Sequence, residues 1–289
     1  MSLRKKFFVC LTVFIFQMAS VLPVFAEGEA IQIKGSDTMV NLGQAWAEEF
    51  MRANPEVSIA VTGGGSGTGI AAIISNTCDI AQASRSMKEE EIEKAENSGE
   101  KIHETIVGYD GIAVVAHPSN PVSGLTIAQI ADIFTGKVKN WNELGGKDLP
   151  ILVLSRDRNS GTHVFFLEHV LRGGNSKGPE EFDTEALMMP SNQSLVQEIK
   201  SSEAAIGYVG LGYVTSDLKV ITVAKNDGSE YVEPSIETVQ NATYPISRPL
   251  YFYTRGTLRP AVQKFIDFVL GPEGQEIIEL LDFVPLNKD

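Results

Sequence analysis

Short apolar runs typical of strands alternate with amphipathic runs typical of helices along nearly the whole chain. The expected strands cover 30–35, 57–63, 79–84, 104–117, 150–155, 204–210, 218–224 and 249–254; the expected helices cover 38–55, 67–76, 87–100, 126–136, 259–271 and 272–283. In the first helix, Leu42, Trp46 and Phe50 recur at four-residue steps, which places them on one face. Such alternation predicts an α/β fold built from mainly parallel sheets flanked by helices.

The N-terminus indicates export. Arg4, Lys5 and Lys6 precede an apolar run, and Val24 and Ala26 form the small-residue pattern of a cleavage site. We therefore expect residues 1–26 to be a cleaved secretory signal peptide. The apolar run is short for a spanning helix, although an uncleaved anchor is the alternative. Cys10 lacks small residues before it, so we expect no lipid-modified cysteine.

Charge and cysteine content exclude several classes of protein. The chain has a formal net charge of −13, which disfavours binding to nucleic acid or to anionic membranes. Cys78 is the one cysteine after the expected cleavage site, so the exported chain cannot form an intramolecular disulfide. We interpret Cys78 as a small core residue rather than a reactive thiol.

Four turns between an expected strand and an expected helix are rich in Gly, Ser, Thr or Arg. They read "KGSDTM" from Lys34, "TGGGSGTGI" from Thr62, "QASRSMKEE" from Gln82 and "SRDRNSGT" from Ser155. Helix N-termini attract small anions, glycine allows close backbone approach, and arginine offers a planar fork of donors. The four turns could therefore converge on one oxyanion beyond the carboxyl ends of the strands. Helix capping alone is the alternative for each turn, and for Arg158 a position on the surface is an equal alternative.

Competing motifs do not fit. The glycine-rich turn lacks the Lys-Ser/Thr ending of an ATP-binding loop, and "RNSGT" is not the Gly-x-Ser-x-Gly elbow of esterases. No two of the four histidines have the spacing of a helical zinc pair, so no metal site and no cofactor are expected. His163 could act as a base, but a histidine on a helix face is the simpler interpretation.

Six motifs together resemble one known family. They are "GSDTM" at 35–39, "GGGSGTGI" at 63–70, "DIAQASR" at 79–85, "GYDGIAVV" at 108–115, "FTGKVKNW" at 134–141 and "SRDRNSGT" at 155–162. In this order and spacing they resemble the periplasmic phosphate-binding proteins of ABC-type phosphate importers. The segment "LGPEGQEII" at 270–278 is similar to the closing helix of that family.

The resemblance implies a two-lobed periplasmic-binding-protein fold, each lobe a mainly parallel sheet flanked by helices, with a ligand cleft between the lobes. The first lobe would comprise 27–113 and 245–289, and the second 114–244. It also implies a binding protein and not an enzyme, one that captures inorganic phosphate and delivers it to an ABC transporter permease in the membrane. We expect a monomer in the periplasm.

The resemblance also assigns ligand contacts. Thr38 would donate its hydroxyl, Met39 its backbone N–H, Ser66 its hydroxyl and Arg156 its guanidinium. The candidate phosphate-binding residues are Ser36, Thr38, Met39, Ser66, Ser84, Arg85, Asp110, Arg156, Ser160, Gly161 and Thr162.

One departure from the family concerns selectivity. Well-known members carry an aspartate at the position of Arg85, where it accepts the proton of hydrogen phosphate and so rejects sulfate. A second family aspartate aligns with Arg158. Asp37 and Asp110 are the candidates to replace the missing acceptor, with Asp110 favoured.

Three other functions remain open at this point. The ligand could be another oxyanion, such as sulfate, molybdate or a phosphonate. The chain could be a secreted phosphatase with Ser160 or Ser66 as nucleophile, although no base or metal cluster accompanies them in the sequence. It could also be a sensor or adhesive surface protein.

Overall fold

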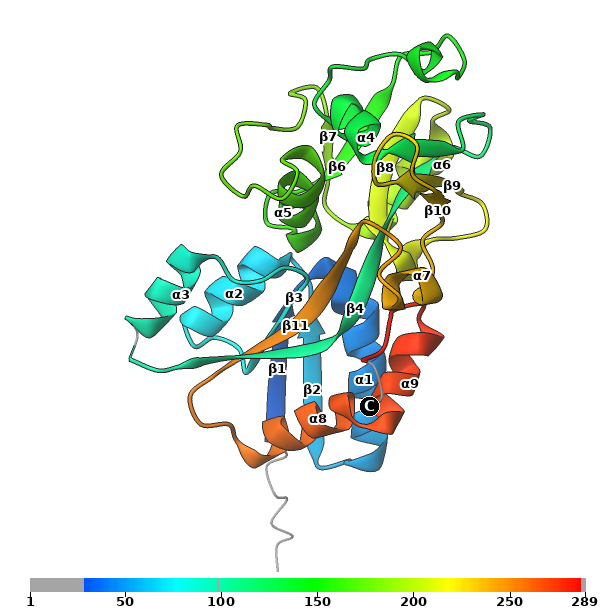
Figure 1. Cartoon of the computed structure of the whole chain (residues 1–289). Coiled ribbons are helices and arrows are strands. Elements are labelled where there is room, and N and C mark those ends of the chain that lie inside the picture. Colours follow the sequence, from blue (N-terminus) through cyan, green and yellow to red (C-terminus); the bar gives the residue numbers. More distant parts are fainter. Residues whose placement is uncertain (1–28, 98, 287–289) are drawn as a thin grey trace, which may run out of the picture.

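The computed structural model describes residues 29–97 and 99–286 (Figure 1). The expected signal peptide at 1–26 and the basic residues that predict it lie outside the described residues. Within the described part of the chain, no helix is both long enough and apolar enough to cross a membrane.

The first lobe, the lower half of Figure 1, is built on a five-stranded sheet. Its strands, in spatial order, are β2 (Val57–Thr62), β1 (Glu29–Gly35), β3 (Ile80–Ala83), β11 (Ser247–Arg255) and β4 (Ile102–Ala116). The first three are parallel, whereas β11 runs antiparallel to both β3 and β4. The sheet is therefore mixed, because a strand from the C-terminal region returns beside the parallel set.

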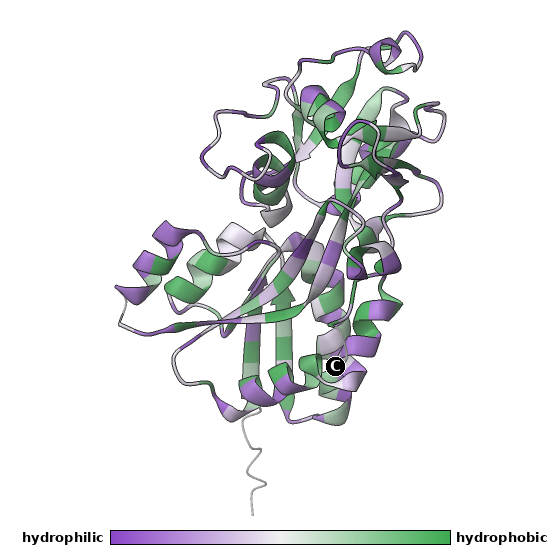
Figure 2. Cartoon of the chain, viewed as in Figure 1, coloured by the Kyte–Doolittle hydropathy of each residue, from purple (hydrophilic) through white to green (hydrophobic). Residues whose placement is uncertain are grey.

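Five helices cover this sheet. On one face lie α1 (Val40–Ala53), α8 (Pro260–Leu270) and α9 (Pro272–Leu280); on the other lie α2 (Ser66–Ile74) and α3 (Glu89–Glu96). Figure 2 shows mainly hydrophobic residues along β1 and β2, whereas α3 is largely hydrophilic. The expected helices at 38–55, 67–76 and 87–100 thus form; α1 and α3 are shorter at both ends, and α2 begins one residue earlier and ends two residues earlier than expected.

The second lobe, the upper half of Figure 1, continues from the end of β4. Its other strands are β5 (Gly124–Thr126), β6 (Leu152–Arg156), β7 (Leu187–Met189), β8 (Ala205–Gly210), β9 (Lys219–Ala224) and β10 (Tyr231–Val232). Its helices are α4 (Ile127–Phe134), α5 (Gly161–Phe166), α6 (Asn192–Ser201) and α7 (Ile236–Gln240), and a π-helical turn at Leu167–Leu171 extends α5. The helices α6 and α7 and the short strands β5, β7 and β10 were not predicted from the sequence.

Two neighbouring strands connect the lobes. Along β4, residues 102–111 pair with β11 in the first lobe, and residues 112–116 pair with β8 in the second. The chain returns at Ile246, whose carbonyl accepts a hydrogen bond from the N–H of Ile112 at 2.8 Å. We propose that the lobes divide here, within a few residues of the boundaries predicted at 113/114 and 244/245.

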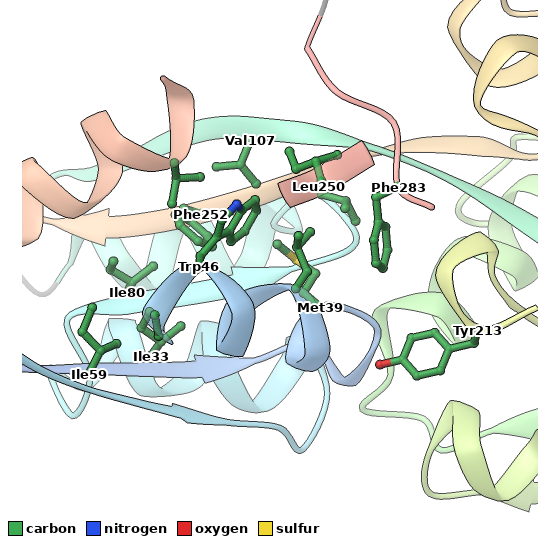
Figure 3. Close-up of a cluster of buried hydrophobic side chains, with 14 of the residues drawn as sticks. Ile33, Met39, Trp46, Ile59, Ile80, Val107, Tyr213, Leu250, Phe252 and Phe283 are labelled. Atoms are coloured by element: carbon green, nitrogen blue, oxygen red, sulfur yellow. The ribbon is translucent and has the colours of Figure 1, made fainter. Parts of the chain in front are cut away.

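The hydrophobic core of the first lobe extends toward the second. Figure 3 shows Trp46 from α1 packed beside Phe252, and Met39 nearby. The same buried cluster includes Tyr213 from the second lobe, which lies beyond Met39 in the figure. This continuity fixes the turn after β1, which carries Asp37 and Thr38, against both lobes.

Trp46 offers a test of how the C-terminal helices are held. Its indole N–H donates to the carbonyl of Gly274 at 2.8 Å, and its side chain is fully buried. A Trp46→Phe substitution leaves that carbonyl without its donor. We expect the free energy of unfolding in urea to fall by about 1–3 kcal/mol. Tyr231→Phe, at a half-exposed side chain, is the control and should change stability by less than about 0.5 kcal/mol. Equal stability of the two variants would contradict the role of this hydrogen bond.

Candidate functional site

The four turns singled out in the sequence all lie at the junction of the lobes. Ser36 and Asp37 follow β1, Ser66 begins α2, and Ser84 follows β3; these belong to the first lobe. Arg156 ends β6 and Ser160 precedes α5 in the second lobe. The fold therefore brings strand ends of both lobes to one place, as expected for ligand binding in α/β proteins.

Two buried threonines meet across the lobes at the centre of this junction. The hydroxyls of Thr38, from the first lobe, and Thr162, from α5 of the second, lie 2.8 Å apart. Arg248 Nη2 donates to the Thr162 hydroxyl at 3.0 Å and to that of Thr38 at 3.4 Å. The sequence analysis predicted both threonines but missed Arg248, which is 2% exposed.

Asp110 holds Arg248 in place. Its Oδ2 accepts hydrogen bonds from Nη2 at 2.9 Å and Nε at 3.3 Å, and its Oδ1 accepts from the N–H of Leu211 at 3.0 Å. Asp110 and Arg248 face each other on adjacent strands β4 and β11. Burial raises the pKa of Asp110, and the ion pair and the Leu211 hydrogen bond oppose that rise. The Thr38–Thr162 contact is thus linked through Arg248 to a fully buried carboxyl.

Three serines of the first lobe form a hydrogen-bonded group beside the threonines. The hydroxyl of Ser36 donates to that of Ser84 at 2.9 Å, and the N–H of Ser84 donates to the Ser66 hydroxyl at 3.0 Å. Gly161 of the second lobe packs directly on this group: a Cβ added there would lie 2.2 Å from Ser66 Oγ and 2.7 Å from Ser84 Oγ. Only glycine allows the N-terminus of α5 to approach the serines this closely.

Arg156 forms the third part of the junction. Nη2 donates to Asp37 Oδ2 at 3.1 Å and to the carbonyl of Pro190 at 3.1 Å, and Nε donates to the carbonyl of Met189 at 3.2 Å. Its guanidinium is almost fully buried. Asp37 belongs to the first lobe, so this ion pair crosses between the lobes.

Both central arginines retain a buried donor that no protein group satisfies. Arg156 Nη1 and Arg248 Nη1 have no hydrogen-bond partner within the described residues. Burial lowers the pKa of Arg248, Asp110 opposes this, and the positive charge of Arg156 adds to the lowering. Two like charges that act on each other and keep free donors are well suited to bind an anion.

Arg85 differs from these two arginines in its partners. Its Nη1 and Nη2 both donate to the carboxylate of Glu91 at 2.7 Å, and Nη1 also donates to the carbonyl of Ser86. Glu91 in turn accepts from the N–H of Lys88 at the start of α3. Its assignment to the anion therefore rests on Nε alone, which is buried and has no partner among the described residues.

Met39 and Arg158 are two further positions that the sequence analysis discussed. The backbone N–H of Met39 donates to the carbonyl of Ser36 at 3.2 Å, within a 3₁₀ turn, and the side chain is in the core. Arg158 is exposed, which matches its interpretation as a surface residue.

A groove of about 580 Å³ opens beside the junction. It lies between the start of α3 in the first lobe and α5 in the second, over β11. Phe165, Tyr251, Lys88 and Lys177 are among its lining residues, and Arg248 also contributes to it. The ring centroid of Phe165 lies 5.6 Å from the guanidinium carbon of Arg248, so Phe165 covers the arginine on this side.

The serines lack the partners that a hydrolase needs. Ser160 Oγ accepts hydrogen bonds from the N–H groups of Thr162 and His163, so it caps α5. The ring of His163 is paired with Ser155 instead, at 3.2 Å. Within the described residues, no group of three or more His, Cys, Asp or Glu side chains could hold a metal ion. The arrangement can bind an oxyanion, and among the described residues neither candidate nucleophile, Ser160 or Ser66, is paired with a base.

Sequence reasoning missed two contributors from distant segments. Arg248 stands inside an apolar strand, where an arginine is unusual and needs a buried partner; that was its available signal. Asn192 donates from both its N–H and its side chain to Asp37. The spacing of Leu195, Val196 and Ile199 after Ser191 could have revealed helix α6, but nothing local connects it to Asp37.

Comparisons with known proteins agree with this geometry. A family model described as a PBP superfamily domain matches residues 25–273. The chain is 34% identical over 269 residues to the phosphate-binding protein PstS of Pseudomonas aeruginosa, covering 87% of this chain and 81% of that protein. It is 32% identical over 258 residues to PstS of Bacillus subtilis, covering 88% and 81%.

The solved structures that this chain resembles also include phosphate-binding proteins of ABC transporters. A putative phosphate ABC transporter substrate-binding protein from Clostridium perfringens, solved with bound phosphate, superposes with a TM-score of 0.79 at 35% identity and covers 90% of this chain and 100% of that one. An ABC-type phosphate transport receptor from Vibrio cholerae has a TM-score of 0.71 at 27% identity, covering 89% and 100%. The two-lobed α/β fold predicted from the sequence is confirmed.

His163 provides a test of the closed packing around α5. Burial and the nearby positive charge of Arg158 lower its pKa from 6.5 to about 4. Between about pH 4 and 6.5 the unfolded chain binds a proton at this residue that the folded chain does not, so stability should fall as pH falls through this window. We expect the loss in unfolding free energy from pH 7 to 4.5 to be smaller by about 2 kcal/mol in His163→Gln. His103→Gln, at an exposed histidine, should retain the wild-type loss; an unchanged loss in His163→Gln would show that His163 is protonated in the folded state.

Proposed function

The chain belongs to the PstS family of phosphate-binding proteins, and we propose that it captures inorganic phosphate between its lobes for delivery to an ABC transporter permease. This is a family of substrate-binding proteins rather than enzymes. Two relatives, at 34% and 32% identity, are phosphate-binding proteins, and the similarity covers 81% of each of them. The observation that carries the proposal is the pair of buried arginines, Arg156 and Arg248, each with a free Nη1 at the junction of the lobes.

Phosphate would complete the hydrogen bonding of this junction. The free donors of the two arginines supply charge, and the hydroxyls of Thr38 and Thr162 can turn from each other to the anion because hydroxyl protons rotate. Ser36, Ser66, Ser84, Ser160 and Gly161 supply further hydroxyls or the N-terminus of a helix. Because these groups are buried, their hydrogen bonds to a dianion would be strong despite the negative charge of the whole chain.

Asp110 is the better supported of the two candidates for the acceptor that distinguishes phosphate from sulfate. Hydrogen phosphate has a proton to donate at neutral pH, and sulfate does not. Burial raises the pKa of Asp110, which makes the carboxylate a stronger proton acceptor. Both carboxylates accept three hydrogen bonds within the protein, so burial is what distinguishes them: Asp110 is fully buried, whereas Asp37 is about a quarter exposed. We retain Arg85 as a candidate contact only through Nε, and propose that its main role is to fix the start of α3 through Glu91.

The permease partner, the monomeric state and the periplasmic location are parts of the same proposal. A protein of similar structure, 27% identical, is an ABC-type phosphate transport receptor from Vibrio cholerae. The basic and apolar pattern at residues 1–26 supports export of the chain, so that it would bind phosphate in the periplasm. A sensor or adhesive role would require no permease, so phosphate uptake by cells that lack this protein would separate the two.

The first test is isothermal titration of the phosphate-stripped protein with phosphate, together with a Gly161→Ala variant. The added methyl group would overlap Ser66 Oγ only when the lobes are together. We expect the dissociation constant for phosphate to rise at least about tenfold, because overpacking of this kind costs about 1–3 kcal/mol. Gly67→Ala is the matched control: its Cβ would lie 3.5 Å from the Asn159 carbonyl, an ordinary contact. Wild-type affinity in Gly161→Ala would remove the junction as the phosphate site.

Selectivity tests Asp110. In Asp110→Asn the ratio of phosphate affinity to sulfate affinity should fall at least about tenfold, since the acceptor is lost while the donors remain. The buried Arg248 also loses its counter-charge, which alters binding of both anions, so the ratio is the informative quantity. Competition titration with sulfate measures it, and an unchanged ratio would exclude Asp110 as the acceptor.

A further inference from the structure

Asp37, in the first lobe, accepts three hydrogen bonds from the second lobe at a single carboxylate oxygen. Asp37 Oδ2 accepts from Arg156 Nη2 at 3.1 Å, from the N–H of Asn192 at 3.0 Å and from Asn192 Nδ2 at 2.9 Å. Its side chain is about a quarter exposed (24%), so it lies at the edge of the closed junction. All three donors would separate from it if the lobes moved apart.

The helix behind Asn192 adds to this contact. Asn192 is the first residue of α6, a ten-residue helix capped by Ser191. The N-terminus of a helix carries partial positive charge, and its first N–H groups have no partner inside the helix. The Asp37 carboxylate fills that position from the other lobe. The side chain of Asn192 is fully buried, so its orientation toward Asp37 is fixed by packing.

Asp37 also determines where Arg156 points. With Nε held by Met189 and Nη2 shared between Pro190 and Asp37, Nη1 is the one nitrogen of Arg156 without a partner among the described residues. The two carbonyls belong to the same lobe as Arg156, but Asp37 does not. The charged contact that neutralises Arg156 therefore forms only when the lobes are closed.

The second buried ion pair behaves differently. Asp110 and Arg248 are direct partners on β4 and β11, the strands that connect the lobes. A hinge motion that separates the lobes leaves this pair intact, because both residues sit in the same stretch of sheet. The two aspartates thus have separate tasks, one within the connecting strands and the other across the cleft.

We propose that Asp37 is a positioning residue that couples closure of the lobes to anion binding, by holding α6 and by aiming Arg156 Nη1 at the ligand. This rests on the proposed function. Opening would break three hydrogen bonds to a charged group at the same time as it releases the phosphate contact of Arg156. Asp37 should therefore control how slowly phosphate leaves, and have little effect on how fast it arrives.

Stopped-flow kinetics of Asp37→Asn tests the proposal. The variant keeps the size of the side chain and loses its charge. We expect the dissociation rate constant for phosphate to rise about ten- to hundredfold, as expected when hydrogen bonds to a charged group are weakened, with an association rate constant within about threefold of wild type. A purely structural role would instead lower the stability of the free protein and leave the dissociation rate unchanged; that result would overturn the proposal.

Asp79→Asn is the matched control. Asp79 has a similar exposure, 27%, and its carboxylate pairs with Arg259 at 2.9 Å and with the N–H of Gln32 at 2.8 Å, all within the first lobe. It should release phosphate at the wild-type rate. An equal acceleration in both variants would mean that loss of any carboxylate of this lobe suffices, and would overturn the specific role of Asp37.

A double-mutant cycle with Asn192→Ala and small-angle scattering complete the test. The effect of Asn192→Ala on dissociation should be clearly smaller in the Asp37→Asn background, and full additivity would contradict the contact. Scattering separates this proposal from the proposed function. If wild type gives no heat with phosphate, the proposed function fails, yet a larger radius of gyration in Asp37→Asn than in wild type would still support Asp37 as the interlobe contact. Equal radii in that case would overturn it.

Discussion

The buried ion pair of Asp110 and Arg248 is the interaction on which the junction depends. An arginine that is 2% exposed is costly unless its charge is neutralised and its donors are used. Asp110 neutralises that charge from the neighbouring strand and accepts hydrogen bonds from Nε and Nη2, which leaves Nη1 without a partner among the described residues. Because the pair lies where β4 and β11 pass between the lobes, it places a positive charge beneath the cleft regardless of how the lobes are set.

The rest of the site is assembled from both lobes around that fixed charge. Thr38, Asp37 and the serines come from strand ends of the first lobe, and Arg156, Thr162 and Gly161 from the second. The hydrogen-bond donors of either lobe alone would not surround a single anion. The hydroxyl contact at 2.8 Å between Thr38 and Thr162, and the close approach of Gly161 to Ser66, exist only in the closed arrangement. In the proposed function, anion binding would therefore favour the closed arrangement of the lobes.

The chain carries net negative charge, and a global field would repel phosphate. Groups close to the proposed site attract the anion at short range and offset this repulsion. Helix N-termini, two guanidinium groups and several hydroxyls act at short range in a buried setting, where hydrogen bonds to an ion are strongest. Carboxylates take part in this arrangement as well: Glu91 fixes Arg85, Asp110 fixes Arg248, and Asp37 fixes Arg156. Each of these three arginines is thus oriented by an acid.

The sequence by itself determined the fold class and the polar turns, because strand and helix periodicity and the Gly, Ser and Thr content of turns are local properties. It predicted Thr38, Ser66, Arg156 and Gly161 near one site, since strand ends of a parallel set meet at one edge. Only the tertiary structure decided which arginines lie buried at the junction of the lobes with an unpaired donor, and which acids hold them. Arg248 is 138 positions from Asp110, and Asn192 is 155 from Asp37. The first contact follows from the pairing of β4 with β11 and the second from the approach of the two lobes, and no local pattern encodes either.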